Sequence, residues 1–363
     1  MITDRTLTKD WFLGLKSKFP KRDPAILERV VKALVLLEQL VQSGLDGFVF
    51  KGGTSLILLL ENTKRFSVDI DLCIKREPKN IDAIFDKVLK KGVFSRWAKD
   101  ERTPKPPMEK AHYRFFFNSV HDNKERAILL DLVFQELNYP EIIKRPISAV
   151  YIETIEPHVE VQVLPVDCML GDKLTAFAPN TCGIPYKIGK DLEIIKQLYD
   201  VSRLFCELKN IELVRETFVK SAEIELAYRG LNRKNYLDVL DDIFQTSIKI
   251  AVKGKSRDQE KFKALSFGIR GFASYISEGT FSIDEAIVCS SHAAYLSQLI
   301  RRSDMIEVKR FDPNVDLREV EIKGEFRYLN KLKKSSPEAF FYFNEAITTF
   351  EQIKNGSNYS KLK

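Results

Sequence analysis

The feature that most constrains the fold of this chain is a change in hydrophobic period near Pro165. Before this point, segments with the alternating pattern of β-strands are mixed with helical segments, whereas after it the apolar residues follow the helical repeat. We therefore predict an α+β domain over residues 1–165, which begins with two helices, and a helical domain over residues 166–363. Strands are predicted at 66–74, 112–120 and 126–135, and weaker ones near 149–154 and 158–164. Helices are predicted at 7–17, 24–43, 54–61, 80–91, 166–178, 190–208, 210–228, 233–252, 258–277, 282–302 and 336–354.

Composition excludes several classes of protein. The 363 residues are 44% hydrophobic and 30% charged, which excludes a disordered chain, a collagen and a coiled-coil rod. The 58 Lys and Arg residues exceed the 51 Asp and Glu residues by 7, a modest excess that permits a polyanionic partner without requiring one. There is no apolar stretch long enough for a membrane span, no signal-peptide pattern and no Cys-x-x-Cys pair, so we expect a reduced, cytoplasmic protein.

A glycine pair lies between a short apolar run and a helix. Gly52 and Gly53 are followed by Thr54 and Ser55 at the predicted helix start. Glycines let backbone amides approach a phosphate, and a helix N-terminus attracts anions. The two hydroxyls are suited to binding a phosphate oxygen or to capping the helix. A tight turn with a helix cap is the alternative interpretation of this motif.

Two carboxylates follow on the next strand. Asp69 and Asp71 are two residues apart, so both point to one face of a strand, and carboxylate oxygens suit Mg²⁺ or Mn²⁺. The alternative is the polar face of a surface strand. Asp131 lies in another strand between the apolar residues Leu129 and Val133, where a carboxylate needs a partner. Three carboxylates on two strands beside a glycine turn predict a two-metal site for phosphoryl transfer.

These motifs resemble a known family. Lys51-Gly-Gly-Thr-Ser-Leu56 followed by Arg65-Phe-Ser-Val-Asp-Ile-Asp-Leu72 is similar to the AbiEii/AbiGii toxin nucleotidyltransferases of the DNA polymerase β-like superfamily. Two later blocks also resemble the family pattern, and the matches span about residues 45–205. They are Gly171-Asp-Lys-Leu-Thr-Ala176 and Ile195-Lys-Gln-Leu-Tyr-Asp-Val201.

The resemblance implies a polymerase-β-like nucleotidyltransferase domain and roles for particular residues. Gly53, Thr54 and Ser55, with Gly52, would hold the triphosphate of a nucleoside triphosphate, and Asp69 and Asp71 would bind the metal ions. Asp131 is added from its spacing as a third metal ligand or general base. Arg65 and Ser67 would orient phosphate or metal-bound water, although Arg65 is equally suited to pairing with a carboxylate.

The later blocks supply two more candidates. Lys173 would contact the triphosphate, with a solvated helix lysine as the alternative. Asp200 would be the carboxylate of the last block, although it is also suited to capping or pairing on its own helix. The family pattern often has Arg-Asp where Lys196 and Gln197 stand, which leaves Asp200 as the only acid of this block. Asp191, at the predicted helix start, is a competing carboxylate, with a helix N-cap as its alternative role.

The resemblance further implies a toxin that transfers a nucleotide to an RNA 3′ hydroxyl, with the acceptor end of transfer RNA as the expected target, and a cognate antitoxin that need not touch it. This would block translation and growth, as in abortive infection by phage. Basic residues that favour RNA binding gather in three stretches, with Phe262 and Phe267 near the first as stacking candidates, although solvated helix faces give the same pattern. They are Lys249, Lys253, Lys255, Arg257, Lys261 and Lys263; Arg301 and Arg302; and Lys331, Lys333 and Lys334.

Three other functions stay open at this level. The acceptor could be a protein hydroxyl, as in AMPylation, or a small molecule. The chain could also be a non-catalytic nucleotide- or RNA-binding module. The intact carboxylates and glycine pair favour an enzyme, and the large helical region disfavours a small acceptor.

Overall fold

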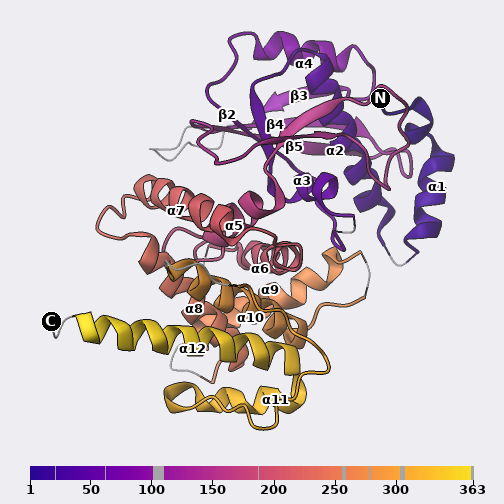
Figure 1. The fold of residues 1–363 in the computed structure, drawn as a ribbon. Helices are drawn as coiled ribbons and strands as arrows, with labels where there is room; N and C mark the ends of the chain where they lie inside the picture. Colours follow the sequence, from indigo (N-terminus) through magenta and orange to yellow (C-terminus); the bar gives the residue numbers. More distant parts are fainter. Residues whose placement is uncertain are drawn as a thin grey trace. The chain divides into compact units, whose positions relative to one another are not determined.

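The computed structural model describes residues 1–20, 22–61, 63–100, 110–186, 188–255, 259–277, 279–302 and 307–360, with side chains described up to residue 354. It divides into two compact units (Figure 1). The sheet unit comprises residues 1–165 and 275–279, and the helical unit comprises residues 166–274 and 280–363. The short segment 275–279 returns to the sheet unit because Tyr275 O accepts a hydrogen bond from Phe66 N, and Ser277 N donates to Lys64 O. The sequence instead predicted that residues 258–277 form one helix of the helical domain, so it did not indicate that segment 275–279 belongs to the sheet unit.

The sheet unit is built on one mixed sheet of the order β3-β4-β5-β2-β1-β7-β6. Two neighbouring pairs, β2 with β5 and β1 with β7, are parallel, and the others are antiparallel. The strands are β1 (Phe48–Lys51), β2 (Ile70–Ile74), β3 (Arg96–Lys99), β4 (Lys110–Asn118), β5 (Glu125–Phe134), β6 (Ile143–Pro146) and β7 (Glu160–Val163). The helices are α1 (Lys9–Lys18), α2 (Pro24–Gln42), α3 (Gly52–Leu59) and α4 (Ile81–Leu89), preceded by a 3₁₀ turn, η1 (Asp4–Leu7).

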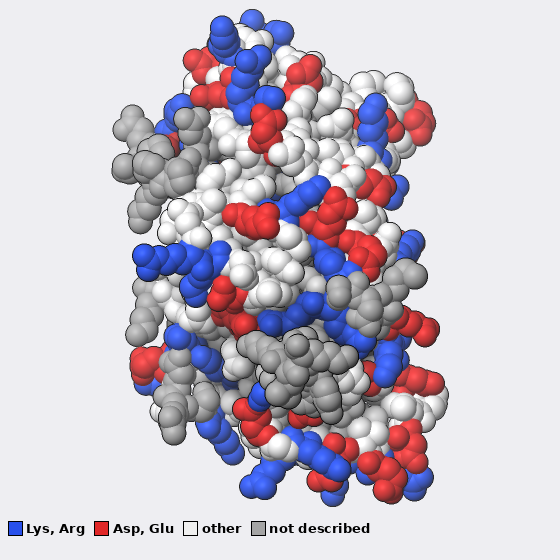
Figure 2. Space-filling model, turned by 60° about the vertical axis from the view of Figure 1, so that its left-hand side comes forward, with Lys and Arg blue, Asp and Glu red and all other residues white. Residues whose placement is uncertain are grey.

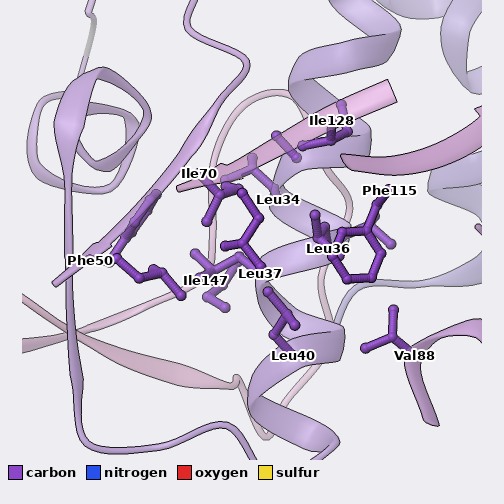
Figure 3. Packing of buried hydrophobic residues seen from close by; sticks show 14 of the residues in the cluster. Leu34, Leu36, Leu37, Leu40, Phe50, Ile70, Val88, Phe115, Ile128 and Ile147 are labelled. Atoms are coloured by element: carbon purple, nitrogen blue, oxygen red, sulfur yellow. The ribbon is translucent and has the colours of Figure 1, made fainter. Parts of the chain in front are cut away.

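One face of the sheet carries the hydrophobic core. On β5 the even-numbered residues Ile128, Leu130 and Leu132 are fully buried, whereas the odd-numbered residues, including Asp131, are half-buried. Figure 3 shows Leu34 and Leu37 of α2 packed in the same cluster as the strand residues Ile70 and Ile128. The opposite face of β5 and β2 is therefore the one that presents polar side chains.

Helix α2 is buried more completely than its sequence suggests. Its charged residues at helical intervals predict an exposed polar face, but Glu28, Lys32 and Glu38 are at most 5% exposed. Glu28 accepts hydrogen bonds from Ser119 Oγ and Val120 N, and Glu38 accepts one from Ile2 N. Such partners offset the cost of burying a charge.

The helical unit confirms the helical prediction for the second half. Its helices are α5 (Val166–Ala176), α6 (Asp191–Cys206), α7 (Ile211–Tyr228), α8 (Tyr236–Ala251), α9 (Gln259–Phe272), α10 (Ile283–Arg301), α11 (Leu332–Ser335) and α12 (Pro337–Ser360), with 3₁₀ turns η2 (Ala273–Tyr275) and η3 (Gly324–Lys331). Tyr275, the last residue of η2, is assigned to the sheet unit.

The fold class is the predicted one, a mixed sheet flanked by helices followed by helices alone. The strand predicted near 149–154 is wrong. Its place in the sheet is taken by β6, which starts at Ile143 and pairs with β7. Only an isolated bridge, Ile2 with Thr154, forms in the predicted range. The proline-rich, charged residues 99–109 predict a loop, and this stretch lies outside the described residues from 101 onward.

Candidate active site

The glycine pair forms the junction between β1 and α3. Gly52 has a φ of +74°, a left-handed conformation that favours glycine. A Cβ atom on Gly52 would overlap the carboxylate of Asp71, and one on Gly53 would overlap the guanidinium of Arg65 and lie 2.6 Å from Ser67 Oγ. The two glycines therefore let α3 begin directly against the carboxylate strand. This brings together five residues that the sequence singled out.

Asp71 and Asp131 meet through the sheet. The parallel pairing of β2 with β5 makes them register partners. Both lie on the half-buried face, opposite the core. The two carboxylates are therefore neighbours on one face of the sheet, and their joint action stays a prediction.

Asp69 lies immediately before β2 and is half-buried. Its backbone carbonyl accepts a hydrogen bond of 2.6 Å from Thr54 Oγ1, which ties the start of the strand to α3. Its Oδ1 atom lies 3.9 Å from Nη2 of Arg29 on α2. Arg29 was not singled out from the sequence.

The hydroxyls of Thr54 and Ser55 are turned toward the backbone. Both residues are fully buried, and Ser55 Oγ donates to Gly52 O at 3.0 Å while Thr54 Oγ1 donates to Asp69 O. They fasten the glycine turn in this structure. The groups at the start of α3 that are suited to a phosphate are accordingly its first backbone amides.

Arg65 and Ser67 lie beside Gly53. Arg65 is 4% exposed, its Nη1 donates to Phe66 O at 3.0 Å, and its backbone bridges Ile276 in the returning segment. Segment 275–279 thus pairs with the residues just before β2, among which are the candidate phosphate-orienting residues.

Two residues missed by sequence reasoning join the site. His112, the register partner of Asp131 on β4, places Nδ1 2.7 Å from Asp131 Oδ1. Lys51, the register partner of Asp71 on β1, donates from Nζ to Tyr139 Oη at 2.6 Å. Lys51 had a visible signal, its position directly before the glycine pair. His112 had none, because strand pairing alone places it.

The donor chemistry of the site suits a divalent cation, since carboxylates of Asp69, Asp71 and Asp131 are hard oxygen ligands. Among the described residues, no group of three or more His, Cys, Asp or Glu side chains is spaced to hold a metal ion. The three-carboxylate metal site therefore stays a prediction.

In the helical unit, the two candidates from the later blocks pair with each other. Lys173 Nζ on α5 lies 2.8 Å from Asp200 Oδ2 on α6, and the side chains are 5% and 1% exposed. Gln197 Oε1 accepts from the same ammonium at 3.4 Å. Asp191 is the first residue of α6, whose N-cap is Lys190. The structure thus joins Lys173 to Asp200 rather than to Asp191.

The fold and the glycine–carboxylate site define a nucleotidyltransferase-type α+β protein. The family model described as the nucleotidyl transferase AbiEii toxin of type IV toxin–antitoxin systems matches residues 35–270, and the chain belongs to this family.

The chain is also similar to solved structures. No match was found among curated proteins. The crystal structure of JHP933 from Helicobacter pylori is 14% identical, with 75% of this chain and 92% of that chain covered and a TM-score of 0.43. A second H. pylori structure, assigned as a nucleotidyltransferase, is 14% identical, with coverages of 77% and 97% and a TM-score of 0.43. At these values neither similarity carries an argument about function.

None of the described helices combines the length and apolar character needed to cross a membrane.

Proposed function

We propose that this protein is a toxin that transfers a nucleotide from a nucleoside triphosphate to an RNA 3′ hydroxyl, with release of pyrophosphate. The observation that carries the proposal is the approach of the Gly52–Gly53 turn to Asp71, which is itself the register partner of Asp131. The turn offers backbone amides and a helix N-terminus to phosphates. The strand offers carboxylates where the reacting phosphate would lie.

The side chains around the turn have distinct proposed roles. Arg65 and Ser67 would orient the phosphates that the turn binds, together with Lys51. A divalent cation held by Asp69, Asp71 and Asp131 would neutralise charge on the phosphates and favour ionisation of the attacking hydroxyl. As the alternative to binding the metal, Asp131 is suited to accepting that proton as a general base. In either role His112 would fix the orientation of its carboxylate through the 2.7 Å contact.

Lys173 and Asp200 are proposed as the functional pair of the two later blocks. In the helical unit the buried carboxylate holds the ammonium in one position. Such fixation is what a lysine needs to act on a triphosphate as a point charge.

The proposed acceptor is RNA, with the transfer-RNA acceptor end as the specific target, so that modification would block translation and arrest growth in phage defence. A lysine cluster in the helical unit supports a polyanionic partner. Burial, and then the charges of Lys255 and Lys253, lower the pKa of Lys331, so lysines of the first and third basic stretches lie near one another. Of the two aromatic stacking candidates near the first basic stretch, Phe267 is exposed, whereas Phe262 packs against Gly254.

The mixed charges on the face drawn in Figure 2 do not distinguish a polyanionic partner from another kind. Figure 2 shows one face on which Lys and Arg side chains are interspersed with Asp and Glu side chains. Arg257, predicted as part of the first basic stretch, lies outside the described residues. The family also implies a cognate antitoxin, and we propose that the toxin acts in the cytoplasm.

The test is incubation of purified protein with total RNA, Mg²⁺ and each labelled nucleoside triphosphate, beside an Asp71→Ala control. The expected result is label in a transfer-RNA-sized band with one triphosphate, absent from the control. Label on a protein instead would replace RNA by a protein hydroxyl as the acceptor. Label on neither, together with thermal stabilisation by no triphosphate, would point to a non-catalytic binding module.

A further inference from the structure

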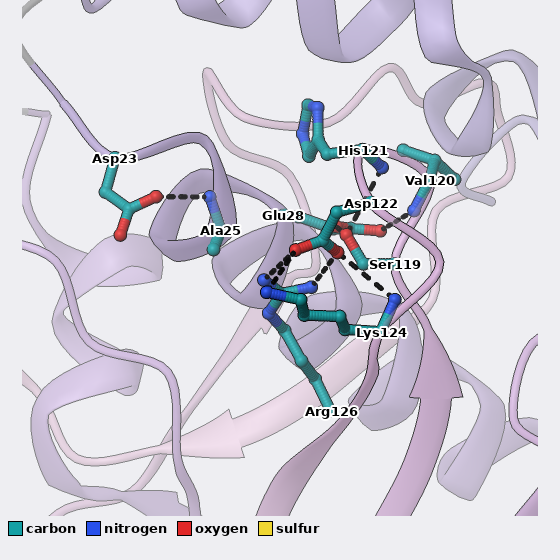
Figure 4. Close-up of polar contacts among 9 residues, drawn as sticks. All are labelled: Asp23, Ala25, Glu28, Ser119, Val120, His121, Asp122, Lys124 and Arg126. Atoms are coloured by element: carbon teal, nitrogen blue, oxygen red, sulfur yellow. Dashed lines mark hydrogen bonds and ion pairs between the residues drawn. The ribbon is translucent and has the colours of Figure 1, made fainter.

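A hollow of about 290 Å³ opens beside the first turn of α2, close to Asp69. It lies within the sheet unit, and its lining includes two arginines, Arg29 of α2 and Arg126 of β5, with Asp23 and Ala127. Figure 4 shows Arg126 reaching toward Asp122, with Asp23 and Ala25 at the start of α2 close by. None of these residues belongs to the motifs that identify the family.

The two arginines differ in how well their charges are balanced. Arg126 makes two hydrogen bonds to Asp122, of 2.6 and 2.9 Å, which raise the pKa of the guanidinium and lower that of the carboxyl. Arg29 has only the 3.9 Å approach to Asp69 among the ion pairs of the described residues. Arg29 Nε is also buried with no hydrogen-bond partner among those residues.

A guanidinium carries five N–H donors, and buried donors in folded proteins are nearly always bonded. Because Nε itself is enclosed, the guanidinium offers a ligand its terminal Nη groups, on a side chain that is 33% exposed. The planar fork of arginine matches an oxygen pair of a phosphate better than any other side chain does.

The position of the hollow decides which phosphate it suits. On one side it is lined by Ala127, four residues before Asp131 on β5, and on the other by Arg29, which lies 3.9 Å from Asp69. Four residues along a strand span about 13 Å. A hollow that extends this far along β5 from the carboxylates suits a nucleic-acid strand whose 3′ end lies at the carboxylates.

We propose that this hollow is a subsite for the phosphodiester backbone of the acceptor RNA, with Arg29 as its principal ligand and the Arg126–Asp122 pair as its far wall. This inference rests on the proposed transfer to RNA. The contact fixes the register of the acceptor, so that the terminal hydroxyl lies at the carboxylates. Binding of the acceptor phosphate also draws the Arg29 charge away from Asp69.

The test compares the full-length protein with its Arg29→Met variant, which keeps the apolar stem, and with Arg29→Lys. A matched control is Arg5→Met, since Arg5 is an exposed arginine of the same unit paired with Glu153. A double variant, Asp122→Asn with Arg126→Met, removes both charges of the far wall together. The measurements are the affinity for labelled total transfer RNA over a salt series, the KM for RNA and for the triphosphate, and thermal stabilisation by the triphosphate.

For Arg29→Met we expect RNA affinity to fall at least about threefold at low salt and the log–log salt slope to shrink by about 0.7, the value for one lost single-strand phosphate contact. The KM for the triphosphate and its thermal stabilisation should not change, and Arg29→Lys should recover part of the loss. RNA affinity equal to wild type in a protein that still labels RNA would overturn the subsite and leave the proposed function standing. Loss of triphosphate binding instead would also overturn it. Absence of RNA labelling by the wild type would remove the proposed function, and the subsite with it.

Discussion

The carboxylate of Asp71 occupies the space that a Cβ atom on Gly52 would need. This relationship couples the backbone of the turn to the position of a predicted catalytic group. It yields a prediction with an internal control, because other glycines of the sheet unit share the backbone conformation without the contact.

Gly52→Ala should lower both stability and activity. The left-handed backbone costs about 1–2 kcal/mol for a residue with a Cβ, and overlap with Asp71 adds about 1–3 kcal/mol. Displacement of the carboxylate should lower kcat at least about 100-fold. Gly92→Ala is the control, since Gly92 has a φ of +77° and nothing within 4 Å of a built Cβ. Chemical denaturation and the labelling assay measure both effects. Equal behaviour of the two variants would contradict the coupling.

His112→Gln should reduce transfer without unfolding the protein. The side chain positions Asp131 through its 2.7 Å contact, and loss of such orienting partners lowers activity about 10- to 100-fold. Asp131→Asn should lower kcat further. His158→Gln, at a half-buried histidine elsewhere in the sheet unit, is the control. Wild-type kcat in His112→Gln would show that Asp131 needs no such partner.

Asp200→Asn should destabilise the helical unit. It leaves the ammonium of Lys173 buried opposite a neutral amide, and removal of one partner of a buried ion pair costs about 3–5 kcal/mol. The double variant Lys173→Met with Asp200→Leu should regain most of the stability but no transfer activity. Urea unfolding and the labelling assay separate the two roles. Recovery of activity in the double variant would assign the pair a purely structural role.

The free energy of unfolding should fall as the pH drops below about 6.5, in part because of His292. Burial lowers the pKa of His292, despite the Glu338 carboxylate at 3.3 Å from its Nε2. Between the unfolded pKa of about 6.5 and the lower folded pKa, the imidazole is protonated in the unfolded chain but neutral in the folded chain. The free energy of unfolding therefore falls over this range by up to about 1.4 kcal/mol per pH unit as the pH drops. The folded environment also contains Ser202, at 2.9 Å from Nδ1, and Arg310.

His292→Gln should flatten this pH dependence. The measurement is the difference in unfolding free energy between pH 7 and pH 5, for wild type and variant. Parallel pH profiles would assign the acid sensitivity to other groups.

Substitution of Lys253, Lys255 and Lys331 by Gln should weaken RNA binding. Burial, and then the charges of Lys255 and Lys253, lower the pKa of Lys331, so a polyanion would relieve the repulsion among them. Lys253 also pairs with Asp284 at 2.9 Å. Three lost phosphate contacts would reduce the log–log salt slope by about 2. The same change at the exposed residues Lys9, Lys18 and Lys220 is the control. Equal loss in both sets would indicate a general charge effect instead of a local surface.

The local elements were predictable because their signals are local. The spacing of apolar residues identified the long helices, the strands around Asp71 and Asp131, and the change to helices after Pro165. The glycine pair before α3 and the Asp69–Asp71 spacing were visible for the same reason. They predicted a site near the start of α3, with the family resemblance supplying the chemistry.

Other features depended on tertiary structure because they join residues far apart in the chain. The parallel pairing of β2 with β5 made Asp131 a partner of Asp71, and β4 added His112. The same holds for the pairing of Lys173 with Asp200 and for the burial of the α2 charges. The hydrophobic period predicts which face of an element is buried. Strand register and helix packing decide which polar groups meet, since these depend on the free energy of the whole assembled unit.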